Sequence, residues 1–157
     1  MLKLISGAPR IEYYTATAST QINNGTPVFL TSGAVAAATA ASTPIAGILM
    51  VDRASTDAST PRIPVIIPTF DTVFEADVKW GVTPLATVEG AQVDIWVGPT
   101  TSDTTGKAYE QYIDTGATTH KMFTVVKVLT PGVASSSTNQ GKVLVKVNNT
   151  SQNVSPA

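Results

Sequence analysis

The sequence predicts an all-β fold, a single small β-barrel or β-sandwich of short antiparallel strands. Apolar and β-branched residues occur in runs of about four to seven residues, the usual length of strands in such folds. Residues that favour turns, mainly Gly, Pro, Asn and Ser, separate these runs. No window of about a dozen residues shows an apolar stripe at helical spacing with a cap at each end. We therefore expect strands and turns, without long helices.

The first half of the chain contains a series of extended apolar runs. Strands are predicted over residues 11–17, 27–30, 45–51, 63–67 and 72–80, and the turn signal Asn24-Gly25 precedes the second of them. The alternation is cleanest in residues 72–80, where Phe74 and Trp80 fall on one face of the strand. We expect both aromatic side chains to enter the core from the same side.

The second half continues the pattern. Strands are predicted over residues 93–97, 122–129 and 143–147. Another short strand is predicted where the pair Tyr109 and Tyr112 flanks it. In the last strand Val143, Val145 and Val147 share one face, and Lys142, Leu144 and Lys146 share the other. This strand should therefore have one buried face and one mixed face.

Segments without strand patterns set the expected boundaries. Residues 34–41 are rich in alanine but short, and Gly33 and Pro44 flank them, so we predict a loop with at most one helical turn. Residues 98–106 and 133–141 have turn chemistry throughout and are predicted to be exposed hairpin loops. The expected organisation is an extended N-terminal arm (residues 1–10), a β domain (11–147) and a polar C-terminal tail (148–157).

The composition disfavours most kinds of chemistry. The 157 residues include no cysteine and one histidine, His120, and charged residues make up only 13% of the chain. Thiol chemistry and disulfides are excluded, and the sequence indicates no catalytic, cofactor-binding or metal-binding residues. The formal net charge is −1 and the basic residues are scattered, so we expect no nucleic-acid binding. No apolar run is long enough for a signal peptide or a membrane-spanning helix, so we expect no membrane association.

One motif favours an enzyme. Residues 112–117, Tyr-Ile-Asp-Thr-Gly-Ala, resemble the Asp-Thr-Gly-Ala box of the retroviral-type aspartic proteases, in which Asp114 would be catalytic. The chain after Asp114 is too short for the rest of such an enzyme. The alternative is a strand that ends in a turn, with the Asp114 side chain accepting a hydrogen bond and Gly116 at positive φ. We favour the turn, and we expect His120 to lie in an exposed turn.

The two tryptophans suggest a binding module. An aromatic ring on an exposed concave face can stack on a sugar, so a carbohydrate-binding β-sandwich of a phage fibre or surface protein is an alternative function. Trp80 and Trp96 both lie in strand-like alternations, however, which favours core or subunit contact. We expect Trp96 to contact a neighbouring subunit.

Several short patterns resemble the head decoration, or capsid cement, proteins of tailed bacteriophages. They are Tyr14-Thr15-Ala16, residues 24–28 (Asn-Gly-Thr-Pro-Val), 44–49 (Pro-Ile-Ala-Gly-Ile-Leu), 71–76 (Asp-Thr-Val-Phe-Glu-Ala), 88–94 (Val-Glu-Gly-Ala-Gln-Val-Asp), 109–115 and 141–147. The resemblance implies a structural virion protein of all-β fold, commonly a trimer. It implies binding to the outside of an expanded capsid, where such a protein bridges subunits of the major capsid protein, after synthesis in the bacterial cytoplasm.

The expected contacts follow from the N-terminal residues. Leu2, Leu4 and Ile5 lie beside Lys3 and Arg10 in the predicted arm, where their apolar side chains would gain most from burial against a partner. We therefore assign these five residues to the capsid contact.

Overall fold

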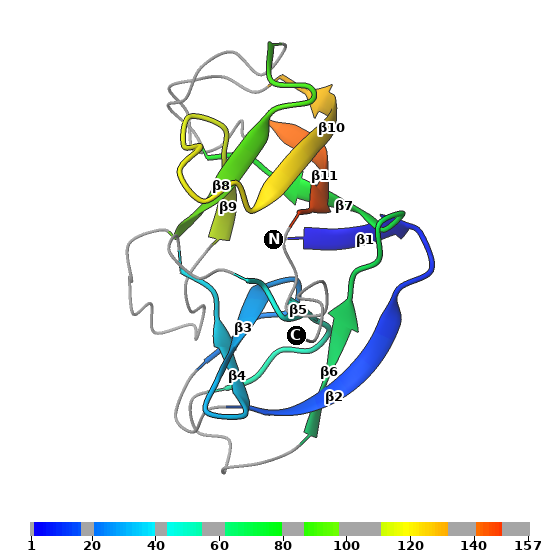
Figure 1. The fold of residues 1–157 in the computed structure, drawn as a ribbon, viewed down its shortest axis with the longest axis vertical. Helices are drawn as coiled ribbons and strands as arrows, with labels where there is room; N and C mark the ends of the chain where they lie inside the picture. Colours follow the sequence, from blue (N-terminus) through cyan, green and yellow to red (C-terminus); the bar gives the residue numbers. More distant parts are fainter. Residues whose placement is uncertain are drawn as a thin grey trace, which may run out of the picture.

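The computed structural model describes residues 2–16, 21–39, 44–54, 62–79, 87–97, 111–131 and 141–148. The strands in these residues form a closed barrel and a six-stranded sheet. Figure 1 shows the barrel in the lower half of the molecule and the sheet in the upper half, with the first strand between them. The all-β prediction is confirmed.

The barrel contains five strands from the first half of the chain. They are β2 (Arg10–Ala16), β3 (Pro27–Thr31), β4 (Ala34–Ala37), β5 (Gly47–Leu49) and β6 (Arg62–Ile67), in the order β2-β4-β3-β5-β6 around the barrel. All neighbouring pairs are antiparallel except β2 and β4, which are parallel. Alternate residues point inward and fill the barrel with small and branched side chains, among them Val28, Val35 and Val65.

Strand β4 corrects one prediction. Residues 34–41 were expected to form a loop, but Ala34–Ala37 pairs with β3 on one side and with the end of β2 on the other. The hairpin turn consists of Ser32 and Gly33, whose φ angles of 49° and 80° are both positive, as a type I′ turn requires. Pairing on both sides outweighs the low strand preference of alanine.

The six-stranded sheet combines the first strand with strands from the second half. Its members are β1 (Leu2–Ser6), β7 (Val73–Asp77), β8 (Gln92–Val97), β9 (Gln111–Asp114), β10 (Phe123–Thr130) and β11 (Lys142–Val147), in the order β1-β7-β11-β10-β8-β9. The backbone N–H of Lys79 donates to the carbonyl of Ile113 at 3.0 Å, beside a parallel bridge between Val78 and Ile113. The sheet thus curls until β9 meets the chain that follows β7. Strand β1 lies at the opposite end of the strand order.

The N-terminal residues differ from the predicted arm. Leu2–Ser6 pairs antiparallel with β7, and Arg10 already belongs to β2. Leu2 is buried, and its N–H donates to the carbonyl of Gly25 in the barrel at 2.9 Å. Leu2 and Leu4 alternate with Lys3 at the period of a strand, and this short pattern is what the arm prediction overlooked.

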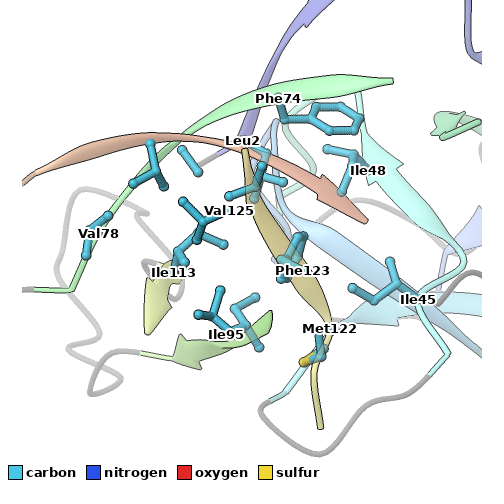
Figure 2. Packing of buried hydrophobic residues seen from close by; sticks show 14 of the residues in the cluster. Leu2, Ile45, Ile48, Phe74, Val78, Ile95, Ile113, Met122, Phe123 and Val125 are labelled. Atoms are coloured by element: carbon cyan, nitrogen blue, oxygen red, sulfur yellow. The ribbon is translucent and has the colours of Figure 1, made fainter. Parts of the chain in front are cut away.

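The two halves share one apolar core. Ile45, Ile48 and Ile66 project from the outer wall of the barrel and pack with residues of the curled sheet. Figure 2 shows Leu2 and Ile48 close to Phe74, which is fully buried as expected. Because neither half covers these side chains alone, the barrel and the sheet are parts of one hydrophobic unit.

Several predictions fall on residues outside the described part. They concern Trp80, Tyr109, the loop 98–106, nearly all of the loop 133–141, and the tail beyond Asn148. In the last strand the alternation is as predicted, because Val143 and Val145 are fully buried whereas Lys142 is exposed.

Candidate functional site

A groove runs beside strand β1, between the sheet and the barrel. It has a volume of about 570 Å³ and is called the β1 groove below. Its lining is mainly apolar, and the polar residues in it are Lys3, Asn24 and Asp52. The apolar lining residues are Leu2, Leu4, Ile48, Leu49, Met50 and Ile66. The backbone N–H of Asn24 donates to Asp52 at 2.7 Å, which fixes one side of the groove. The apolar lining continues the shared core out to the surface.

Exposed apolar side chains also occur on β1 and β2, outside the lining of the groove. Ile5, Ile11 and Tyr13 have 47%, 51% and 57% of their surface exposed. Ile11 and Tyr13 are two residues apart on β2 and therefore lie on the same face of that strand. Their register partners on β6 are Ile66 and Pro64. Since Ile66 belongs to the shared core, this face is the outer wall of the barrel.

The most exposed large apolar side chain among the described residues is Phe70, at 91%. Phe70 lies in the turn between β6 and β7, residues 69–72, called the Phe70 turn below. The N–H of Thr72 donates to the carbonyl of Thr69 at 3.0 Å, and the N–H of Thr69 donates to the Thr72 hydroxyl at 2.9 Å. Thr72 is fully buried. The turn is therefore held from both ends while its aromatic side chain faces solvent.

A carboxylate lies next to Phe70 in the same turn. The hydroxyl of Thr69 donates to Asp71, and this bond, helped by the N–H of Ala8 and by the charge of Lys146, holds the pKa of Asp71 below its ordinary value. Ala8 belongs to the connection between β1 and β2, which passes beside the Phe70 turn. Asp71 is exposed and ionised at neutral pH.

The outer face of the sheet has mixed charge. The Lys142 ammonium lies 2.9 Å from Glu75 and 3.5 Å from Asp77, and these two carboxylates raise the pKa of Lys142 above its ordinary value, with the hydrogen bond to Glu75 as the largest cause. Glu75 is also the register partner of Lys3. Lys3 itself forms no ion pair within the described residues. Its charge is therefore available at the rim of the β1 groove.

The residues assigned to the capsid contact are divided by the structure. Leu2 is 6% exposed and belongs to the core, so it offers no free surface. Leu4 is 38% exposed, and Lys3 and Ile5 are also exposed on β1. Arg10 has an exposed side chain that lies 3.3 Å from Glu12 on β2. The structure thus brings Lys3, Leu4 and Ile5 together on one strand and separates Arg10 from them.

Trp96 is half-buried in β8. Its ring packs against Tyr112 of β9 with 5.8 Å between the centroids. The Lys79 ammonium lies 5.1 Å from the centre of the Trp96 ring, so a cation already occupies a position over the aromatic system. This arrangement gives less support to sugar stacking than an open ring face would.

The aspartic protease motif forms a structural turn. The Asp114 carboxylate accepts the N–H of Gly116 at 3.0 Å and lies 3.0 Å from the Lys79 ammonium. The predicted hydrogen bond of the turn is therefore present. The φ angle of Gly116 is not positive, so that part of the prediction is wrong. With both oxygens engaged, the carboxylate has a clear structural role.

A second buried carboxylate lies opposite Asp114. Asp94 is its register partner on β8 and is 2% exposed. Asp94 accepts the backbone N–H of His120 at 3.0 Å, and the His120 Nδ1 atom lies 3.5 Å from it. His120 is in an exposed bend, as predicted. The described residues contain no group of three side chains that could hold a metal ion.

Sequence reasoning missed Phe70. The signal is present in residues 68–72, Pro-Thr-Phe-Asp-Thr, where turn-forming residues surround a single aromatic residue between two predicted strands. The apolar alternation of the two flanking strands does not account for an aromatic residue in the turn between them. It could have been recognised as an exposed contact residue.

Comparison of the chain with family models, curated proteins and solved structures found no match in any of the three. Among the described residues, no helix has the length and apolar character needed to cross a membrane.

Proposed function

We propose that this chain is a structural virion protein that binds the outer surface of an expanded bacteriophage capsid and bridges subunits of the major capsid protein. It would be made in the bacterial cytoplasm and would catalyse no reaction. A protein that binds only the assembled shell stabilises that shell by its binding free energy, repeated over many sites. The resemblance of the sequence to head decoration proteins supports this proposal.

The observation that contributes most is the exposed apolar face of β2. Ile11 and Tyr13 are each more than half exposed on a strand whose backbone is fixed by pairing with β6. Rigid, exposed aromatic and branched side chains bind a partner with little loss of conformational entropy. Ile5, on β1, is also exposed. We therefore place the centre of the capsid contact on Ile11 and Tyr13 of β2, rather than on the five N-terminal residues assigned from the sequence.

The test is binding of the purified protein to expanded heads that lack it, followed by heating. Wild-type protein should bind and raise the temperature at which the heads release DNA. The double substitution Ile11→Ser and Tyr13→Ser should weaken binding at least about tenfold, because it removes apolar area from the contact. Its free energy of unfolding should stay close to that of the wild type, since both side chains are largely exposed.

Matched controls are available on the opposite part of the fold. Val126→Ser and Leu129→Ser change side chains of β10 that are 42% and 44% exposed. These variants should bind heads like the wild type. Absence of wild-type binding, or binding without a gain in head survival, would overturn the proposal. Deletion of residues 1–10 is a poor test, because it removes β1 from the sheet.

A further inference from the structure

The Phe70 turn presents an exposed aromatic side chain beside a carboxylate, and the β1 groove is a mainly apolar hollow whose lining includes Lys3. Phe70 is 91% exposed, whereas the next most exposed large apolar side chain of the described residues, Tyr13, is 57% exposed. The β1 groove is open, mainly apolar and, at about 570 Å³, large enough to accept a phenyl ring. Both features therefore leave apolar surface in contact with water.

The turn has a negative charge, and the groove has one positive and one negative charge. Asp71 follows Phe70 directly in the turn, and its carboxylate is exposed. Lys3 lines the groove and forms no ion pair within the described residues. The remaining charge at the groove, Asp52, already accepts a hydrogen bond from Asn24. A Phe70 side chain in the groove would bring an Asp71 carboxylate to the Lys3 side of the rim, which favours the contact electrostatically.

The rigidity of the turn is a further requirement for an anchor residue, and it is met. Thr69 and Thr72 are joined by a backbone bond and by side-chain bonds, and their hydroxyl oxygens lie 2.8 Å apart. The connection between β1 and β2 packs closely against the same turn at Gly7. An aromatic side chain on a fixed turn loses little entropy when it is buried, which is the usual property of residues that dominate an interface.

We propose that Phe70 of one copy of this chain inserts into the β1 groove of a neighbouring copy, with Asp71 beside Lys3 of that neighbour. The two surfaces differ, so the contact is head-to-tail rather than two-fold symmetric. Head-to-tail contacts produce closed rings when the rotation between copies closes. Ile11 and Tyr13 do not line the groove, and the contact does not depend on capsid binding.

The first test measures assembly of the full chain in solution by sedimentation or light scattering over a range of concentrations. Wild-type protein should form a discrete oligomer. Phe70→Ala should raise the dissociation constant about 30-fold or more, the size expected for loss of a central aromatic anchor. Leu129→Ala, on β10, removes an exposed apolar side chain elsewhere and should leave assembly unchanged. Lys3→Glu should weaken assembly several-fold, whereas Lys127→Glu should not.

A mixing experiment then tests the head-to-tail geometry. Leu4→Arg fills the groove while Phe70 stays intact, and Phe70→Ala removes the anchor while the groove stays intact. Each variant alone should be monomeric, and a mixture should form a dimer with one intact contact and no larger species. Met50→Arg provides a second groove variant if Leu4→Arg does not fold, and the melting temperature of each variant shows whether it does.

A wild-type protein that stays monomeric would overturn the proposal, as would a Phe70→Ala variant that assembles like the wild type. Mixed variants that form no dimer would exclude the head-to-tail contact. Because all measurements use the protein without heads, they are separate from the capsid test. The Ile11→Ser and Tyr13→Ser double variant should assemble normally even if it no longer binds heads.

Discussion

Gly7 lies where the connection from β1 to β2 passes the Phe70 turn. Its φ is +101°, and a Cβ atom at this position would come within 2.6 Å of the Thr72 Cα atom and 2.8 Å of the Asp71 carbonyl oxygen. Both neighbours belong to the backbone and cannot move aside cheaply. The close passage therefore requires glycine for space as well as for conformation.

Gly7→Ala should accordingly destabilise the fold more than a glycine substitution that meets only conformational strain. Gly33 is the matched control, since its φ is +80° but nothing lies within 4 Å of a Cβ built there. Strain in the left-handed region costs about 1–2 kcal/mol, and overpacking adds about 1–3 kcal/mol. Chemical denaturation should show a larger loss for Gly7→Ala than for Gly33→Ala. Equal losses would mean that the backbone at Gly7 and the Phe70 turn can move apart without lowering the free energy of unfolding.

At the scale of elements, the β3–β4 hairpin has a turn that its sequence does not fully favour. Ser32 has a φ of 49° at the first central position, where Asn followed by Gly is the preferred pair of a type I′ turn. Ser32→Asn should therefore stabilise the protein, by a few tenths to about 1 kcal/mol, because Asn tolerates positive φ better than Ser. Chemical denaturation measures this gain as a higher midpoint concentration of denaturant, with an unchanged slope of the unfolding free energy against denaturant concentration.

A substitution with the opposite expected effect provides the check on this hairpin prediction. Ser32→Val places a β-branched residue at positive φ and should destabilise the protein. The exposed position of Ser32 means that packing contributes little to either result. Ser32→Asn with stability below that of Ser32→Val would show that this turn does not govern the hairpin.

The strands that could be predicted from the sequence are those whose alternation reports burial directly. Phe74, Ala76 and Val78 alternate with half-buried neighbours and all lie in the core, where Phe74 was predicted to lie. Strand β4 could not be predicted in this way, because its alanines gain their strand conformation from two neighbouring strands that are distant in sequence. Strand β1 was missed because its alternation covers only Leu2, Lys3 and Leu4, which is too short to distinguish a strand from an arm.

The candidate site was predictable only in part, for a related reason. Leu4 and Ile5 are exposed as expected, whereas Leu2 is buried, since its side chain packs in the core that the barrel and the sheet share. The β1 groove combines residues from β1, β5 and β6 with two connecting segments of the barrel, and local patterns do not specify such a combination. Phe70 was visible in the sequence, but its exposure depends on how the turn is oriented on the folded chain.

For the whole molecule, the shared core determines how the protein unfolds. The outer wall of the barrel supplies Ile45, Ile48 and Ile66 to the same cluster that fills the curled sheet. A barrel that separated from the sheet would expose these side chains to water, at about 25 cal/mol for each Å² of apolar surface. Partial unfolding of one half is therefore costly. We expect a single cooperative transition for both halves.

Ile48→Ala tests this coupling, because the substitution lies in the barrel while the affected core extends into the sheet. Ile48 is 1% exposed, and its truncation should cost about 2–5 kcal/mol. If the halves unfold together, hydrogen exchange of the slowest amides should accelerate by the same factor in β3 of the barrel and in β10 of the sheet. Leu30→Ala, which changes a 40% exposed side chain of β3, should accelerate neither. Exchange that accelerates in β3 while β10 keeps its wild-type protection would mean that the two halves open independently, and that the contact between them contributes little to the stability of the sheet.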